Sequence, residues 1–253
     1  MGVTVPMVPT TINGRWTLLL PEHRAARQEW FTGWEKERLA AMADCIRPGD
    51  LVYDIGAEEG DFPALWASWG ADVVLVEPNP KVWANIRAIF EANDVENRVR
   101  GWFVGFAGDE LRDRPAWNDE HVEPPDDPRT DWWPSCAYGP VIGDHGFLVI
   151  PERPDCPITT IDRLAEFYGP PTVITIDVEG AELTVLRGAH RTLVENRPRV
   201  FVSCHTDIEW MTLKFEGDEF PALDAYMRSL GYEGTHLATD HERHMCYLHP
   251  DGR

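Results

Sequence analysis

The chain has 253 residues, 43% of them hydrophobic and 26% charged, which is enough for one substantial globular domain. Its 43 acidic and 23 basic residues give a formal net charge of −20, and such a surface repels duplex nucleic acid and anionic lipid. No run of about 18 apolar residues is present, so no membrane-spanning helix is expected. The five cysteines are scattered and lack a Cys-x-x-Cys pair, and residues 1–12 lack the features of a secretory signal. We therefore expect a cytoplasmic protein with reduced thiols.

Short apolar runs and helical spacings alternate through the first hundred residues. The expected strands lie at 16–20, 51–55 and 73–77, and the expected helices at 33–46, 61–69 and 81–92. Residues 1–32, which include the strand at 16–20, are interpreted as an N-terminal extension. Strand and helix in this order build right-handed βαβ units, so the sequence predicts an α/β fold with a largely parallel sheet.

The alternation stops at about residues 109–157, a stretch rich in proline that also holds Trp117, Trp132 and Trp133. So many prolines exclude a regular helix or a central strand, and the tryptophans argue against a plain disordered linker. We interpret the stretch as an insertion that forms a lid over the site or only decorates the surface. Its tryptophans can stack on sugar rings or form a small satellite core.

The α/β alternation resumes after the insertion. Strands are expected at 173–177, 200–204 and 245–248, and helices at 181–195 and 219–230. No internal repeat is present, so residues 1–253 are interpreted as a single domain.

A glycine-bearing turn, Asp54-Ile55-Gly56-Ala57-Glu58-Glu59-Gly60, follows the strand at 51–55. Glycines let the backbone turn sharply and approach a ligand, and in open parallel sheets ligands bind at this strand end. The spacing differs from the Gly-x-Gly-x-x-Gly fingerprint of dinucleotide-binding proteins. The acidic pair Glu58 and Glu59 would repel a pyrophosphate but not the sulfonium and ammonium groups of S-adenosylmethionine. A purely structural glycine turn is the alternative.

A carboxylate, Glu77, ends the next strand, 17 residues after Gly60. An acid at this place in a nucleotide-binding βαβ unit accepts hydrogen bonds from both ribose hydroxyls. Together with the glycine turn, Glu77 indicates a nucleoside site.

Acidic residues also surround the turn after the strand at 173–177. Asp177, Glu179 and Glu182 lie there, although Glu182 also suits the positive end of the helix dipole. His205 directly follows the strand at 200–204, where an imidazole can act as a general base near neutral pH. Asp177, Glu179 and His205 are also plausible ligands of a hard metal, but no spacing requires one, so we expect no resident metal.

The ordered set of these segments resembles the FkbM family of methyltransferases over roughly residues 33–235. The segments are Pro48-Gly49-Asp50, Asp54-Ile55-Gly56-Ala57 with Gly60, Val76-Glu77-Pro78-Asn79-Pro80, Thr160-Ile161-Asp162-Arg163-Leu164, Ile176-Asp177-Val178-Glu179-Gly180-Ala181-Glu182, Val185-Leu186-Arg187-Gly188-Ala189 and Arg197-Pro198. The resemblance implies a seven-stranded Rossmann-like methyltransferase fold, with a mostly parallel sheet and an antiparallel closing strand. It also implies S-adenosylmethionine as the methyl donor and O-methylation of a sugar or natural-product hydroxyl.

The resemblance assigns site residues by position in this chain. The donor site comprises Asp54, Gly56, Ala57, Gly60, Glu77 and Asn79, and the catalytic residues are His205, Asp177 and Glu179. The expected partner is a small-molecule or carbohydrate acceptor. Two other functions remain open from the residues: a nicotinamide-dependent oxidoreductase, and a non-catalytic binding protein with a methyltransferase fold.

Overall fold

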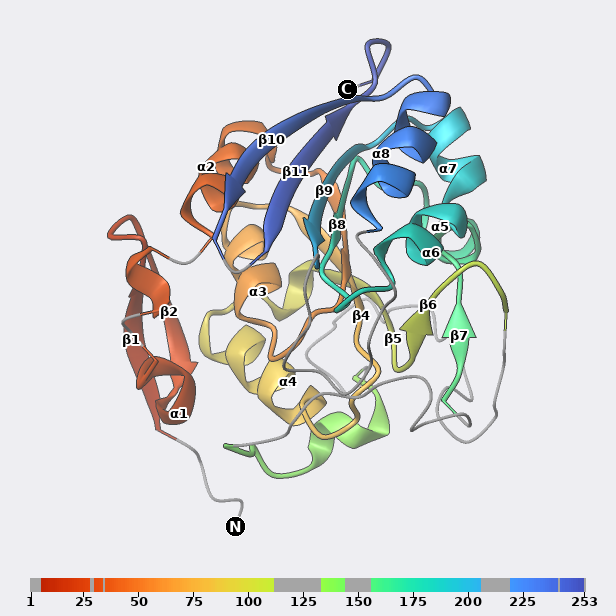
Figure 1. Ribbon diagram of the computed structural model, residues 1–253. Coiled ribbons are helices and arrows are strands. Elements are labelled where there is room, and N and C mark those ends of the chain that lie inside the picture. The colour runs from red at the N-terminus through yellow and green to blue at the C-terminus, as the bar shows by residue number, and fades with distance from the viewer. Residues whose placement is uncertain are drawn as a thin grey trace.

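A seven-stranded sheet forms the centre of the protein (Figure 1). The computed structural model describes residues 6–27, 30–33, 35–111, 133–143, 156–205, 219–240 and 242–252. The strand order is β10-β11-β9-β8-β3-β4-β5. The strands from β9 to β5 pair in parallel, whereas β11 pairs antiparallel with both β9 and β10. This confirms the expected α/β fold with seven strands, most of them parallel.

The described residues form the following elements. The strands are β1 (Met7–Ile12), β2 (Trp16–Pro21), β3 (Leu51–Ile55), β4 (Asp72–Val76), β5 (Val99–Phe103), β6 (Phe106–Ala107), β7 (Ile158–Thr159), β8 (Val173–Ile176), β9 (Arg199–Cys204), β10 (Glu233–Thr239) and β11 (Arg243–Leu248). The α-helices are α1 (Glu22–Ala25), α2 (Lys36–Cys45), α3 (Asp61–Ser68), α4 (Trp83–Ala92), α5 (Ile161–Tyr168), α6 (Glu182–Arg187), α7 (His190–Glu195) and α8 (Phe220–Ser229). Short 3₁₀ turns cover Trp30–Thr32, Glu96–Arg98 and Ser135–Tyr138.

Helices cover both faces of the sheet, as Figure 1 shows. Successive side chains of a strand point to opposite faces, so the buried strands supply two cores. Val73 and Leu75 of β4 pack with α2, α3 and α4. Val74 and Val76 of the same strand pack with α5, α6, α7 and α8. The sheet is therefore the middle of three layers. The ends of its strands are the part of the sheet at which a site can form.

The N-terminal extension folds as a separate two-stranded hairpin, β1–β2, followed by α1. Leu18 and Leu20 of β2 are buried in the core that α3 and α4 share. Asn93 also fixes the backbone of Leu19, because its side-chain amide bonds both the N–H and the carbonyl of that residue. The expected strand at 16–20 is thus present, but it lies outside the main sheet.

Three features of the main domain differ from the sequence-based expectation. The strands β5 and β10 were not expected; β10 lies at the edge of the sheet, where its mostly exposed side chains give little hydrophobic pattern. The helix expected at 181–195 is divided into α6 and α7. Gly188 lies at the break, and a Cβ there would lie 1.8 Å from the carbonyl oxygen of Gly108. This close approach of two backbones requires a glycine at the break.

The described part of the insertion packs on α4. Trp133 is 6% exposed, and its ring centroid lies 5.8 Å from that of Phe90. The side chain of Asn85 bonds both the N–H and the carbonyl of Ile142. Trp133 therefore belongs to the core, whereas Trp117 and Trp132 lie outside the described residues. That the insertion at 109–157 forms a lid over the site remains a prediction.

None of the described helices has the length and apolar character needed to cross a membrane.

Candidate functional site

Four neighbouring strands end side by side where the expected site residues lie. The strands β4, β3, β8 and β9 are parallel, so their carboxyl ends share one edge of the sheet. Glu77 follows β4, Asp54 lies near the end of β3, Asp177 follows β8 and His205 follows β9. Adjacent strands are about 4.8 Å apart, so Glu77 and His205 bracket an edge roughly 14 Å long.

The glycine turn is shaped by its packing against neighbouring chain segments. Gly56 has a φ of +94°, and a Cβ there would lie 1.8 Å from the carbonyl oxygen of Asp177. Gly60 has a φ of +88°, and its Cβ would lie 3.1 Å from Ile86. The N–H groups of Gly56 and of the buried Ala57 both donate to the carbonyl of Val76. A valine at position 56 would therefore disturb the joining of β3 to β8 before it met any ligand.

The Glu77 carboxylate is held in a fixed orientation. One of its oxygens accepts from the backbone N–H of Glu58 at 3.0 Å and the other from that of Asn79 at 2.8 Å. The Asn79 side chain in turn accepts from the N–H of Lys81. Burial raises the pKa of Glu77 to about 8, although the two backbone hydrogen bonds oppose this shift. Glu77 is thus an oriented acceptor, and no ion pair links it to a cation in the part of the chain that the structure describes.

Asp54 is a second buried acid beside the turn. It is 4% exposed, and within the described part of the chain its Oδ2 has no hydrogen-bond partner. Burial raises the pKa of Asp54 to about 8, while the charge of Arg38 acts in the opposite direction. A buried carboxyl oxygen without a partner is costly unless a ligand supplies a donor or a cation.

From the sequence we expected Glu58 and Glu59 to face the ligand. In the structure both instead bind the N-terminal extension. Arg24 of α1 donates to Glu58 at 2.9 Å and to Asp61 at 2.8 Å. The fully buried Glu59 lies 2.5 Å from Nε2 of His23. The extension is therefore attached to the glycine turn and to the start of α3 through Arg24 and His23.

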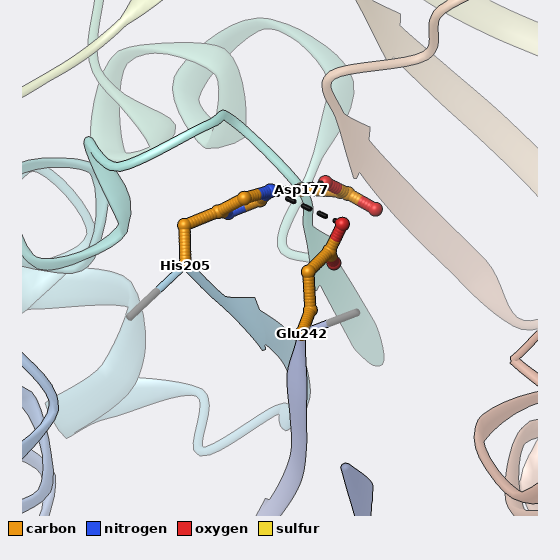
Figure 2. A group of neighbouring side chains, drawn as sticks. All are labelled: Asp177, His205 and Glu242. Atoms are coloured by element: carbon orange, nitrogen blue, oxygen red, sulfur yellow. Dashed lines mark ion pairs between the residues drawn. The ribbon is translucent and has the colours of Figure 1, made fainter. Parts of the chain in front are cut away.

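The three expected catalytic residues lie together around the His205 imidazole, whose side chain is 5% exposed. Its Nε2 lies 3.1 Å from Glu179 and 3.8 Å from Asp177, and its Nδ1 lies 2.7 Å from Glu182. Figure 2 shows a further carboxylate, Glu242, whose Oε1 is 3.2 Å from Nε2. The imidazole is thus surrounded by four acids.

A strained turn aims two of these acids. Glu179 has a φ of +56°, which is rare for a residue with a side chain, and Gly180 has a φ of +101°. Glu182 accepts from the N–H of Gly180 at 2.9 Å as well as facing His205, so it does more than complement the dipole of α6.

Two members of the site were missed by sequence reasoning. Arg38 of α2 is buried among Glu35, Thr175 and Asp177, and its Nη1 lies 3.4 Å from the Asp177 carboxylate. A single arginine in an amphipathic helix gives no signal of this role. Glu242 directly precedes β11, and the pairing of Arg243 with Cys204 brings it beside His205. The sequence shows Glu242 just before the expected closing strand. That it lies beside His205 depends on the antiparallel register of β11 and β9.

The acids around His205 change its protonation. Burial alone would lower the pKa of the imidazole, but Glu179, Glu182, Glu242 and Asp177 together raise it well above its ordinary value. An imidazole that keeps its proton at neutral pH has no lone pair with which to accept another. The role of His205 as a general base stays a prediction, and this arrangement favours a role for the whole cluster.

Comparisons with known proteins show the family to which the chain belongs. The model of the methyltransferase FkbM domain matches residues 54–233. No curated protein matches the chain significantly. The crystal structure of the methyltransferase FkbM from Methylobacillus flagellatus KT is 16% identical, with a TM-score of 0.52, over 91% of this chain and 56% of its own length. The chain thus spans little more than half of that protein.

Two further solved structures are similar at lower TM-scores. Precorrin-6y C5,15-methyltransferase from Geobacter metallireducens GS-15 has a TM-score of 0.47 and 11% identity, over 85% of this chain and 87% of that one. A SAM-dependent methyltransferase from Thiobacillus denitrificans in complex with S-adenosyl-L-homocysteine has a TM-score of 0.44 and 13% identity, over 81% and 67%. Because the family model covers well over half of its residues, the chain belongs to the FkbM methyltransferase family.

Proposed function

We propose that the protein transfers a methyl group from S-adenosylmethionine to a hydroxyl oxygen of a small or carbohydrate-like acceptor. The observation that carries the proposal is the Glu77 carboxylate, which two backbone N–H groups orient at a strand end beside the glycine turn. The proposed donor residues are those expected from the sequence: Asp54, Gly56, Ala57, Gly60, Glu77 and Asn79.

The donor residues fit a ligand that carries hydroxyl groups and positive charge. Glu77 can accept from both ribose hydroxyls, and the unpartnered oxygen of Asp54 can accept from or pair with a cationic group. S-adenosylmethionine supplies both, together with a methyl group on a sulfonium centre. The acids of the turn itself pair with Arg24 and His23, so they leave the ligand side to Asp54 and Glu77.

The second cluster fits the acceptor side of the reaction. In methyl transfer the acceptor oxygen forms a bond to the methyl carbon while the sulfur–carbon bond breaks and sulfur keeps the electron pair. The acceptor hydroxyl must also lose its proton, which a nearby carboxylate or water can take. Asp177 and Glu179 lie two strands from Glu77 along the same edge and His205 lies three, where they can orient a hydroxyl and favour this loss.

Replacing Glu77 by alanine tests the donor site. We expect the affinity for S-adenosylmethionine to fall by about 1.5–3 kcal/mol, the range for hydrogen bonds to a charged group. Isothermal titration calorimetry measures it, with Glu233→Ala, a change at an exposed position of β10, as the control. Unchanged affinity in a folded Glu77→Ala protein would remove Glu77 from the site. Binding of a nicotinamide nucleotide instead would favour an oxidoreductase, and binding of neither ligand a non-catalytic protein.

Donor affinity is expected to depend on pH. Because the pKa of Glu77 is about 8 in the ligand-free protein, the carboxyl is largely protonated at pH 7. Ribose hydroxyls and a nearby sulfonium favour the carboxylate, so binding releases a proton and the affinity rises with pH up to about 8–9 and then levels off. Calorimetry at pH 6 to 9.5 measures this, and Glu77→Gln should reduce the slope. The same slope in the variant would assign the proton to another group.

A further inference from the structure

Three potential ligand atoms converge on one point beside β8, β9 and β11. Oxygens of Asp177 and Glu242 and a nitrogen of His205 all lie within 4.8 Å of one another. The Nε2–oxygen distances are 3.8 Å to Asp177 and 3.2 Å to Glu242 (Figure 2). Two ligands bound at about 2.1 Å to one cation and at right angles to each other are roughly 3 Å apart. The spacing of the three atoms therefore suits a single small cation.

The His205 imidazole provides an independent indication of a ligand. Its side chain is 5% exposed, and among the described residues its Nε2 completes no hydrogen bond, although carboxylate oxygens flank it. Its Nδ1 lies 2.7 Å from Glu182, which is itself held by the N–H of Gly180. When a cation displaces the proton of Nε2 while Nδ1 donates to Glu182, the freed lone pair of Nε2 points into the group of acids. A carboxylate that orients a histidine in this way is typical of metal sites in proteins.

The local charge also requires a cation. Asp177, Glu179, Glu182 and Glu242 lie within 4 Å of one imidazole. Arg38 also reaches Asp177, but it is shared with Glu35. Four acids around one basic group are a net negative site that is partly closed to water, and a divalent ion compensates such a charge better than one proton.

We propose that Asp177, His205 and Glu242 bind a divalent cation on the acceptor side of the site, with Glu182 as the group that orients His205. The mixed nitrogen and oxygen ligands suit a first-row ion such as Mn²⁺ better than Mg²⁺ or Ca²⁺, which prefer oxygen alone. This inference rests on the proposed function for its role: the cation would polarise the acceptor hydroxyl, so that its proton leaves more readily when the oxygen attacks the methyl carbon.

Mn²⁺ binding tests the proposal without any acceptor. The protein is freed of metal by chelator, and bound Mn²⁺ is measured by electron paramagnetic resonance during a titration. We expect about one Mn²⁺ per chain. Glu242→Gln and Asp177→Asn should each weaken binding at least 10-fold, and Glu182→Gln should weaken it about 10–100-fold, the usual effect of losing an orienting partner. Glu233→Gln on β10 is the matched control and should bind Mn²⁺ like the parent protein.

The parent protein alone also provides a test, because a cation that binds only the folded state raises the melting temperature. The proposal is overturned if Mn²⁺ at 100-fold excess over the chain neither binds nor raises the melting temperature, or if Glu242→Gln binds it as well as the parent does. Calorimetry with S-adenosylmethionine on the same metal-free sample separates the two proposals. Donor binding without Mn²⁺ binding leaves only the function standing, and Mn²⁺ binding without donor binding leaves only the metal site.

Discussion

Replacing His205 by alanine is expected to lower methyl transfer by about 10²–10⁴-fold, the span for losing a group that acts directly on a proton transfer. The imidazole is the centre of the acidic cluster, so its loss removes a base or a cation ligand and leaves the surrounding acids to repel one another. Donor affinity should change little, because Glu77 lies at the far end of the edge.

The measurement uses labelled methyl donor and a panel of glycans, macrolides and other hydroxylated acceptors. His236→Ala, which changes an exposed histidine of β10, is the control. Near-normal turnover of His205→Ala would leave positioning of the acceptor as the catalytic device. A parent enzyme that is indifferent to chelator would favour the base, whereas loss with chelator and recovery with Mn²⁺ would favour the cation.

The second large effect is expected on stability. Replacing Arg38 by methionine keeps most of the buried side-chain volume but removes the guanidinium that pairs with Glu35 and Asp177. Removing one partner of a buried ion pair costs about 3–5 kcal/mol, because the remaining charge stays buried and uncompensated. Urea unfolding followed by circular dichroism should show a loss of this size in the free energy of unfolding.

Arg228→Met is the matched control, since Arg228 pairs with Asp224 on the exposed face of α8. Exposed pairs of this kind contribute about 0.3–0.5 kcal/mol. If Arg38→Met loses no more than this control, the Arg38 pairs are not important for folding, and Arg38 acts only to position Asp177.

Much of the donor side could be predicted from the sequence because its signals are local. The strand at 51–55, the glycine turn and Glu77 lie within 30 residues of one another, and one βαβ unit brings them together. The same holds for Asp177 and Glu179, which share one turn. His205 could be assigned to the same site because the carboxyl ends of parallel strands meet at one edge of the sheet.

Other features depended on contacts between distant segments. The sequence showed Glu58 and Glu59 as acids in a glycine turn, but the hairpin at the N-terminus brings Arg24 and His23 to them. Trp133 could have faced an acceptor, yet the packing of the insertion on α4 buries it against Phe90.

Tertiary structure decided which further charged groups join Asp177, Glu179 and His205. The sequence determined that Asp177, Glu179 and His205 follow the ends of strands. The strand order makes those two strands neighbours. Glu242 reaches them only because β11 inserts antiparallel between β9 and β10, so that the start of one strand lies beside the end of another. Arg38 reaches them because its side chain extends from α2 to Thr175 of β8. Local patterns fix which residues end a strand, but the charge that surrounds a buried group depends on every element packed against it.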